Sequence, residues 1–298
     1  MTELVSIIMP AYNAESFIEE AINAVIKQSY LNWELIVVDD GSNDSTANIV
    51  KKIQLSHGNI IYVHQKNKGL GSARNYGIKT ATGRWIAFLD SDDLWKPNKL
   101  EVQINASQRI DTDIIFSSGY YLNEKTQVLS PYNSWIGIFS GQELYPMLLR
   151  HNNIPVLSVL IKKSLAEKIG LQDTNVLAFG NEDWDYWLRA SKENALFLGL
   201  EEKLFEYRVH EHSMSQKSVR MRIANLYVLN KNYTARLLTK ADRDYFRMVF
   251  VNNIPFLIKN LISGIQFSLL YISLLFKITG KYLPSFLIKH PKLNSKTI

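Results

Sequence analysis

Three aspartates crowd together after an apolar run of the sequence, at Asp90, Asp92 and Asp93. In an extended segment residues i and i+2 point to the same side, so we expect Asp90 and Asp92 to face one pocket. Carboxylates this close repel each other unless a cation or a proton lies between them, and Mg²⁺ and Mn²⁺ prefer oxygen ligands. The pattern predicts a divalent-metal site. A solvated turn that caps the following helix is the competing interpretation.

A second acidic group, Glu182, Asp183 and Asp185, stands far along the chain at the start of a predicted helix. A carboxylate that faces a pocket there can act as a general base. The helix dipole also favours acids in a first turn, so a purely structural role is the alternative.

Two further polar groups have side chains that suit a phosphate-containing ligand, although the glycine spacing before Arg74 matches neither the Gly-x-Gly-x-x-Gly motif nor the P-loop. Arg74 lies at the start of a predicted helix that a glycine-containing segment precedes, and such an N-terminus can hold phosphate. Arg208 and His210 end a predicted strand and share one of its sides, where they can grip a diphosphate or, for His210, ligate a metal. Taken singly, a histidine such as His210 is more often a packed or surface residue than a ligand.

The elements that position these residues alternate between strands and helices. Apolar runs predict strands at 4–9, 33–38, 59–64 and 84–89, and helical periodicity predicts helices at 14–28, 45–53 and 71–80. This alternation indicates an α/β fold with a mainly parallel sheet, in which ligands bind beyond the carboxyl ends of the strands. The polar groups at 10–13, 39–42 and 90–93 fall at three such ends. Asp39 and Asp40 also suit a turn that caps the next helix.

The middle of the chain is less regular. We expect strands at 113–117, 156–161, 196–198 and 203–207, helices at 141–150, 181–192 and 219–238, and a surface loop rich in Tyr, Asn and Ser at 119–135. The chain has no cysteine, which excludes disulfides, thiolate metal sites and cysteine nucleophiles.

Taken together, the polar motifs resemble those of family-two glycosyltransferases, which have the GT-A fold. The resemblance covers about residues 4–215 and rests on VSIIMPAYN at 5–13, VVDDGSND at 37–44, NKG at 67–69 with ARN at 73–75, FLDSDD at 88–93 and NED at 181–183. Each motif alone is moderately specific, whereas the ordered set is highly specific.

The resemblance implies a role for each matching residue. Nucleotide binding is expected of Pro10, Tyr12, Asn13, Asp40, Arg74, Asp90 and Ser91. A cofactor, Mn²⁺ or Mg²⁺, is expected at Asp92, assisted by Asp90 and Asp93. Asp183 resembles the catalytic base with Glu182 beside it, and Arg208 and His210 resemble residues that close around the diphosphate. Asp185 is the main rival for the base.

The resemblance also implies substrates. We expect a nucleoside-diphosphate sugar as donor, first a UDP-sugar with dTDP- and GDP-sugars as alternatives, and an inverting transfer to a saccharide acceptor. A polyprenyl-diphosphate-linked acceptor of surface polysaccharide synthesis fits, with the loop at 119–135 helping to set acceptor choice. A metal-dependent nucleotidyltransferase that acts on sugar phosphates is the alternative enzyme, and a sugar-nucleotide-binding scaffold is the alternative without catalysis.

The C-terminal part has a different charge. From residue 240 onward nine Lys or Arg face two Asp, whereas the preceding 239 residues hold 25 basic and 26 acidic side chains. Such a basic tail suits anionic lipid better than nucleic acid, which we do not expect as a partner. The expected organisation is a catalytic domain at 1–215, a helical connector at 216–253 and an amphipathic, membrane-associating segment at 254–298. We therefore expect a peripheral protein at the cytoplasmic face of the inner membrane; a helix pair packed on the catalytic domain and a true membrane span are the alternatives.

Overall fold

The computed structural model describes residues 3–210 and 218–260, and the contacts divide the chain into two units, Met1–Asn225 and Leu226–Ile298. Most of the segment at 254–298, for which we expect membrane association, lies outside the described residues. Within the described ranges, no helix combines the length and the apolar character that crossing a membrane requires.

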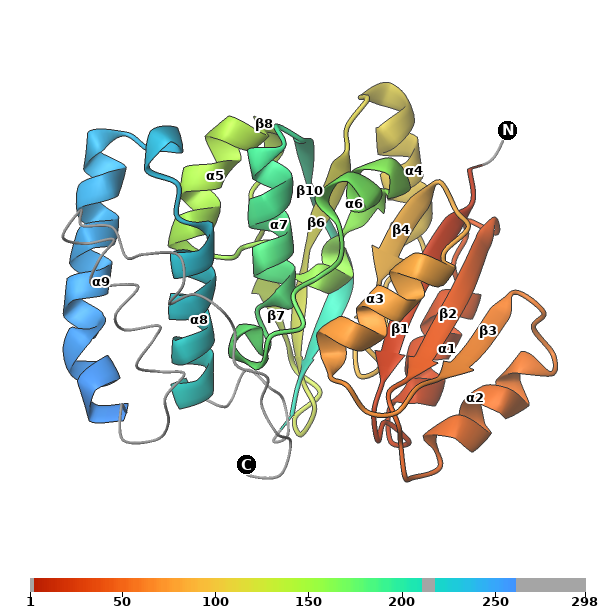
Figure 1. Cartoon of the computed structure of the whole chain (residues 1–298). Coiled ribbons are helices and arrows are strands. Elements are labelled where there is room, and N and C mark those ends of the chain that lie inside the picture. Colours follow the sequence, from red (N-terminus) through yellow and green to blue (C-terminus); the bar gives the residue numbers. More distant parts are fainter. Residues whose placement is uncertain (1–2, 211–217, 261–298) are drawn as a thin grey trace. The chain divides into compact units, whose positions relative to one another are not determined.

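The first half of the unit Met1–Asn225 is a parallel βαβ arrangement (Figure 1). The strands β1 (Val5–Ala11), β2 (Trp33–Asp39), β3 (Ile60–His64) and β4 (Trp85–Phe88) lie in the order β3-β2-β1-β4, all parallel. The helices between them are α1 (Ile18–Ile26), α2 (Thr46–Gln54) and α3 (Leu70–Thr80). Every residue of β1 is buried because this strand lies inside the sheet with both faces covered.

The second half makes the sheet mixed. Strand β9 (Leu160–Lys162) runs antiparallel to both β4 and β6 (Ile114–Asn123), and the remaining order is β6-β10-β5, with β10 (Leu196–Val209) parallel to β6 and antiparallel to β5 (Leu94–Trp95). The short strand β8 (Gly137–Ser140) pairs antiparallel with β10. The prediction of a mainly parallel sheet holds for β3-β2-β1-β4 and for the β6–β10 pair, and the antiparallel strands β9, β5 and β8 make the whole sheet mixed.

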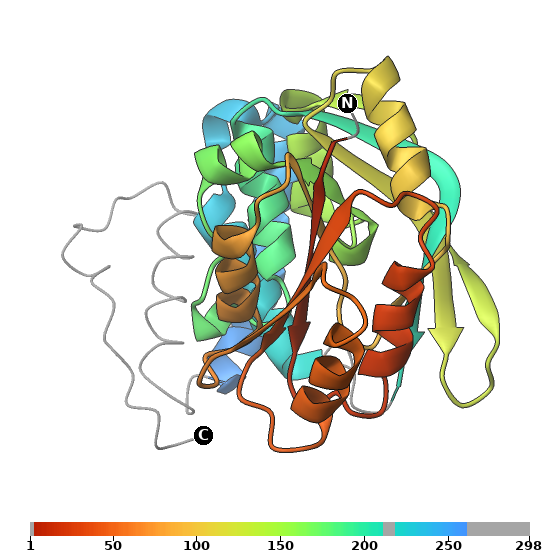
Figure 2. The same cartoon turned by 90° about the vertical axis from the view of Figure 1, so that its right-hand side faces the viewer.

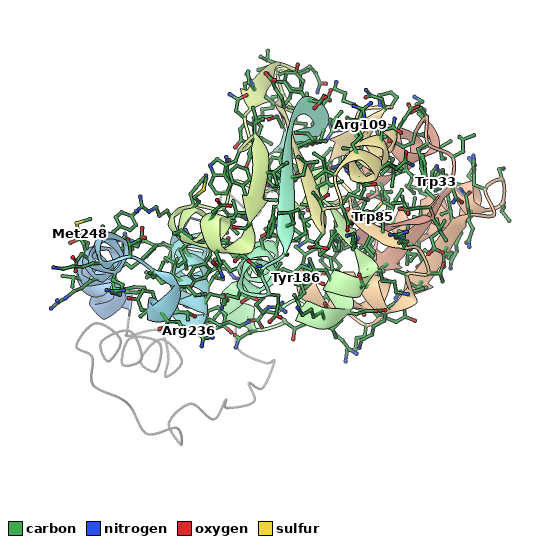
Figure 3. All side chains as sticks on the ribbon, turned by 90° about the horizontal axis from the view of Figure 1, so that it is seen from above. Trp33, Trp85, Arg109, Tyr186, Arg236 and Met248 are labelled. Carbon is green, nitrogen blue, oxygen red and sulfur yellow. The ribbon has the colours of Figure 1, made fainter. Side chains whose placement is uncertain are left out.

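Helices cover both faces of this sheet. In Figure 2, α1 and α4 (Lys99–Arg109) lie on one side of it, and α3, α6 (Lys163–Ile169) and α7 (Glu182–Lys192) lie on the other. Helix α5 (Gly141–Arg150) packs beside α7. In α1 the buried residues Ile18, Ala21, Ile22 and Val25 recur at helical spacing, which is why this segment forms a helix on an apolar sheet. Large side chains fill the interior between the sheet and the helices, among them Trp85 of β4 and Tyr186 of α7 (Figure 3).

The described chain after residue 217 is helical. It contains α8 (Ser218–Asn232), a short 3₁₀ turn at Ala235–Leu237 and α9 (Lys240–Asn260). The helix predicted at 219–238 therefore ends earlier than expected.

Three predictions for the middle of the chain are wrong. The segment at 119–135 is not a loop: β6 continues to Asn123 and forms an antiparallel hairpin with β7 (Leu129–Tyr132). The strands expected at 196–198 and 203–207 are one strand, β10. The register of β10 shifts between Leu200 and Lys203 and again between Lys203 and Glu206, which interrupts the apolar–polar alternation by which a strand is recognised in a sequence. The strand expected at 156–161 begins as a 3₁₀ turn, Val156–Ser158, before β9.

Close packing of α3 on β1 gives a test of the fold. A methyl group added at Gly77 overlaps the side chain of Ile8, so we expect Gly77→Ala to lower the free energy of unfolding by about 1–3 kcal/mol. Alanine by itself stabilises a helix relative to glycine by roughly 1 kcal/mol. A loss of stability in this variant must therefore come from the overlap with Ile8. Urea denaturation measures it, with Gly58→Ala as the control, since nothing lies within 4 Å of a Cβ at that position. Equal midpoints for the two variants would contradict this packing.

Candidate active site

The carboxyl ends of β1, β2 and β4 bring three polar turns to one edge of the sheet. Ala11, which ends β1, pairs with Asp39, which ends β2, and the Asp40 N–H donates to the Ala11 carbonyl at 2.8 Å. Pro10 is buried inside β1. The residues after these strands, at 12–13, 40–42 and 90–93, therefore share one edge, as parallel strands require.

The two aspartates after β2 hold the backbone of neighbouring segments. The Asp40 carboxylate accepts the N–H groups of Lys68 and Gly69, both at 2.8 Å, and the side-chain amide of Gln65 at 2.7 Å. Asp39 accepts the Ser42 N–H at 2.8 Å and the hydroxyl of Tyr62 at 2.6 Å. A carboxylate offers about four acceptor positions, and the three donors to Asp40 occupy most of those of this residue.

A glycine allows the turn after β2 to lie against the segment that leads into α3. Gly41 has φ +80°, and a Cβ there would lie 2.9 Å from the Asn67 nitrogen. The turn after β2 and the segment that leads into α3 are thus in contact, which fixes the position of α3 relative to the edge of the sheet.

Tyr12 and Asn13 follow β1 with different surroundings. Asn13 adopts φ 49°, its N–H donates to the Ser42 hydroxyl at 3.0 Å, and its Oδ1 accepts the Asn43 N–H at 2.9 Å. Tyr12 is 51% exposed. Asn13 therefore joins the two turns, while the Tyr12 ring remains accessible at the edge.

Arg74 is the cation at the centre of the site. Only 3% exposed, it donates from Nη2 to both oxygens of Asp90, at 2.7 and 2.9 Å. Burial opposes the charge of the guanidinium, but the carboxylates of Asp90, Glu182 and Asp183 outweigh it and raise the pKa of Arg74. Arg74 thus links the acidic turn after β4 with the acidic start of α7.

The acidic turn after β4 differs from the expected extended segment. The Asp93 N–H donates to the Asp90 carbonyl at 3.1 Å, so the chain turns through Ser91 and Asp92. The expectation of an extended backbone at 90–92 is therefore wrong. Asp90 binds Arg74, whereas Asp92 Oδ2 lies 2.9 Å from Nε2 of His210.

Asp93, 2% exposed, accepts the backbone N–H of Arg208 at 2.8 Å. Burial, together with the charges of Asp92 and Asp90, raises the pKa of Asp93 well above its usual range. The turn therefore concentrates negative charge that a cation would relieve.

The residues of this turn fit a metal that binds together with its substrate. Within residues 3–210 and 218–253, no three His, Asp or Glu side chains converge as a complete metal site. Asp92 and His210 nevertheless form a facing carboxylate–imidazole pair. Mg²⁺ and Mn²⁺ commonly use one or two protein ligands when substrate phosphates supply the others.

Arg208 and His210 both reach the acidic turn, as the strand pattern predicts. Arg208 donates from Nε to the Asp92 carbonyl at 2.7 Å and from Nη2 to Glu20 at 2.6 Å. The Phe17 ring lies 5.0 Å from the Arg208 guanidinium and 5.2 Å from the His210 ring. The hydrogen bond to Asp92 outweighs burial and raises the pKa of His210. The partners Glu20 and Phe17 have no signal in the sequence, because α1 meets β10 only in the fold.

The two acids that begin α7 have different environments. Asp183 accepts the Trp184 N–H at 2.7 Å on Oδ1 and the Asn152 amide at 3.3 Å on Oδ2, and part of its surface remains exposed. Burial raises the pKa of Asp183 to about 6, although Arg74 opposes this shift, and the nearby Asp90 charge adds to it. The influence of Asp90 places the two acidic groups in one site.

Glu182 is directed into the protein. It is 6% exposed, burial raises its pKa to about 7 against the effect of Arg74, and its Oε2 has no hydrogen-bond partner among the described residues. Asp185 is fully buried and paired with Nε of Arg189 at 2.9 Å. Of the three acids, Asp183 is therefore the one placed to meet a substrate.

Comparisons with known proteins agree with this geometry. The family described as Glycosyl transferase family 2 matches residues 6–168. The uncharacterized glycosyltransferase RT0329 of Rickettsia typhi is 38% identical over 214 residues, which are 70% of this chain and 64% of that protein, so this chain spans less than two thirds of that relative. WfgD of Escherichia coli, named UDP-Glc:alpha-D-GlcNAc-diphosphoundecaprenol beta-1,3-glucosyltransferase, is 39% identical over 194 residues, 64% of this chain and 71% of that protein.

A solved structure supports the fold. Residues 1–349 of Staphylococcus aureus TarS, crystallised with UDP-GlcNAc, superpose with a TM-score of 0.67 at 18% identity, covering 93% of this chain and 80% of that chain. The GT-A α/β fold that the sequence predicts for the catalytic part is confirmed, with a mixed sheet.

The central cation can be tested by its effect on stability. Arg74→Met leaves three carboxylates without their cation, so we expect a loss of roughly 3 kcal/mol in the free energy of unfolding at pH 8. The loss should be smaller at pH 5, because the pKa values of Glu182 and Asp183 already lie near 7 and 6 and rise further in the variant, which lets the folded protein bind protons there.

Urea denaturation at both pH values measures this difference. Arg84→Met is the control, since Arg84 forms an exposed ion pair with Glu3 and should contribute less than about 1 kcal/mol. A loss for Arg74→Met that is small and independent of pH would contradict the assignment.

Proposed function

Because the chain belongs to glycosyl transferase family 2, we propose that it transfers a sugar, with inversion at the anomeric carbon, from a nucleoside-diphosphate sugar to a hydroxyl of a saccharide acceptor. One observation carries this proposal. A partly exposed carboxylate, Asp183, whose pKa is raised to about 6, stands beside the Arg74–Asp90 pair at the carboxyl edge of the sheet. A base of this pKa is ionised at neutral pH and still accepts a proton readily.

In the proposed reaction Asp183 takes the proton of the acceptor hydroxyl. The acceptor oxygen attacks the anomeric carbon and forms the new glycosidic bond, while the bond from that carbon to the nucleoside diphosphate breaks on the opposite face. A single displacement inverts the anomeric configuration and needs no covalent enzyme intermediate. The burial of Asp185 in its ion pair with Arg189 is consistent with one base acting from this helix.

The donor nucleotide is assigned to the edge formed by β1, β2 and α3. The exposed Tyr12 ring is available for stacking on the base, and Asp40, at the same edge, is assigned to accept a base N–H. Asn13 and Ser91 lie in the turns around this position, and Pro10 lies in β1 just before the first of these turns. A UDP-sugar is the proposed donor, supported by the UDP-Glc in the name of WfgD and the UDP-GlcNAc bound to TarS.

The donor diphosphate is assigned to the acidic turn and the end of β10. Mn²⁺ or Mg²⁺, bound at Asp92 and His210 with Asp90 and Asp93 nearby, would neutralise charge that develops on the leaving diphosphate. Arg208 lies at the same place and contributes a second positive charge. Glu20 and the Asp92 carbonyl each accept one of the five guanidinium N–H groups, and the others are available as donors to a phosphate.

For the acceptor we propose a saccharide linked to a polyprenyl diphosphate, in the synthesis of a surface polysaccharide. The name of WfgD, which describes a diphosphoundecaprenol-linked acceptor, supports this class. A lipid-linked acceptor also accounts for the basic C-terminal segment, which is consistent with peripheral association at the cytoplasmic face of the inner membrane.

The catalytic base is tested by substitution. We expect Asp183→Asn to lower turnover at least about a hundredfold, because the asparagine amide cannot accept the proton, while binding of the UDP-sugar persists. Transfer is followed by release of UDP, and donor binding by calorimetry. Near-normal turnover would contradict the assignment, and release of pyrophosphate in place of UDP would favour the nucleotidyltransferase alternative.

The pH dependence of the rate gives a second test. Because Asp183 must be ionised and its pKa is about 6, log kcat/KM should rise with pH below about 6 and level off above it. The hydrogen bond that the Asn152 side-chain amide donates to Asp183 lowers that pKa. Asn152→Ala should therefore move the rising part of the pH profile to higher pH. A rising part that stays in place in Asn152→Ala would show that another group controls the rate.

The metal role is tested at Asp92. Asp92→Ala should abolish the dependence of UDP-sugar binding on Mn²⁺ or Mg²⁺, because the carboxylate of the facing pair is lost. Asp111→Asn, which alters an exposed aspartate paired with Lys162, is the control and should retain that dependence. Unchanged metal dependence in Asp92→Ala would refute the role.

Membrane association is tested with the basic tail. Replacing Lys281, Lys289, Lys292 and Lys296 by glutamine should weaken co-sedimentation with vesicles that contain anionic lipid. The effect should disappear at high salt, because screening removes the attraction in the unchanged protein as well. Equal sedimentation of both proteins at low salt would contradict the electrostatic contribution.

A further inference from the structure

Three tyrosines share one face of the ribbon formed by β7, β6 and β10. Tyr121 of β6 pairs with Tyr207 of β10 in the parallel register, and Tyr132 of β7 lies on the diagonal from Tyr121 across the hairpin. The Tyr121 ring lies 5.2 Å from the ring of Tyr132 and 5.9 Å from that of Tyr207. Figure 2 shows that the β6–β7 hairpin extends beyond the helices that flank the sheet.

A buried phenylalanine of β10 packs beside this aromatic face, on the same side of the ribbon. The Phe205 ring, fully buried, lies 5.6 Å from the Tyr132 ring. It occupies the space that a side chain at position 119 would need, since a Cβ on Gly119 would lie 2.5 Å from the Phe205 ring. Gly119 therefore permits Phe205 to support Tyr132, which orders the tyrosine face before any ligand arrives.

Hydrogen bonds attach this face next to Asp183. The Ser134 hydroxyl, two residues after Tyr132, donates to the Asn153 carbonyl at 2.6 Å, and the Asn153 amide donates to the Asn133 carbonyl at 3.3 Å. The neighbouring Asn152 donates to Asp183. The charge of Asp183 is close enough to raise the pKa of Tyr132, after the larger effects of burial and of Tyr121.

The chemistry of the face suits a sugar ring. Aromatic rings carry negative charge on their faces, so they attract the C–H groups that line one side of a pyranose. The tyrosine hydroxyls add hydrogen-bonding groups that match sugar hydroxyls, whereas a hydrocarbon chain has no group that can pair with them. Tyr121, 38% exposed, offers the most accessible of the surfaces.

We propose that Tyr121, Tyr132 and Tyr207 form the acceptor subsite, where they bind a pyranose ring and present one of its hydroxyls to Asp183. The inference rests on the proposed function, in which Asp183 accepts the proton of that hydroxyl. It identifies the acceptor's sugar, and not its lipid, as the part that this hairpin recognises.

The test uses a synthetic α-GlcNAc-diphosphoryl alkyl lipid as acceptor and UDP-glucose as donor. Tyr121→Ala should weaken calorimetric binding of the acceptor and raise its KM by about tenfold, because one ring face is lost. Binding of UDP-glucose should stay within about twofold, since the tyrosines lie away from the nucleotide edge. Tyr121→Leu keeps the apolar bulk of the hairpin without a flat ring and should behave like Tyr121→Ala. Tyr76→Ala, at an exposed tyrosine of α3, is the matched control and should bind the acceptor normally.

Acceptor binding and KM in both Tyr121 variants equal to those of the unchanged protein would overturn the subsite. So would an unchanged protein that binds UDP-glucose but does not bind the saccharide probe. Failure of the unchanged protein to bind any UDP-sugar would instead count against the proposed function, and saccharide binding by calorimetry would still decide the subsite.

Discussion

The site depends on one buried cation, Arg74, placed among three carboxylates from two segments of the chain. Asp90 follows β4, and Glu182 and Asp183 begin α7. Without a positive charge between them these acids would repel each other and resist burial. With it, they remain close, and the balance between burial and the attraction of Arg74 leaves Asp183 with a pKa near neutrality. The same contact that holds the two acidic groups in the fold therefore sets the basicity that the proposed chemistry requires.

The remaining geometry follows from how parallel strands end. Because β1, β2 and β4 finish at one edge, short turns after them hold groups of different function without long loops. Asp40 connects the turn after β2 with the segment before α3, which carries Arg74. On the other side of the acidic turn, β10 brings Arg208 and His210 to Asp92. The tyrosine face lies on the hairpin beside β10, and hydrogen bonds connect this hairpin to the segment that contacts Asp183.

The sequence allowed prediction of the first half of the sheet, because its buried strands and amphipathic helices have clear periodicity and polar residues mark the strand ends. It also identified the residues that gather around Arg74, although their roles in binding and catalysis stay predictions. The hairpin at 119–135 was missed, since its tyrosines and polar residues suit a loop as well as a strand. The turn at 90–93 was misread, because the same letters fit an extended or a turned backbone. Partners such as Asn152 and Glu20 depend on packing between distant elements, which no local pattern contains.

The most direct test of the central claim is the ionisation of Asp183 itself. Carbon NMR of protein labelled at the aspartate Cγ, with the signal assigned by its loss in Asp183→Asn, follows this carboxyl through a pH titration. The account predicts a midpoint near 6 in the unchanged protein and a higher midpoint in Arg74→Met, because the cation that favours the charged form is gone. A midpoint near about 3.9, the ordinary value for aspartate, that does not move in Arg74→Met would contradict it.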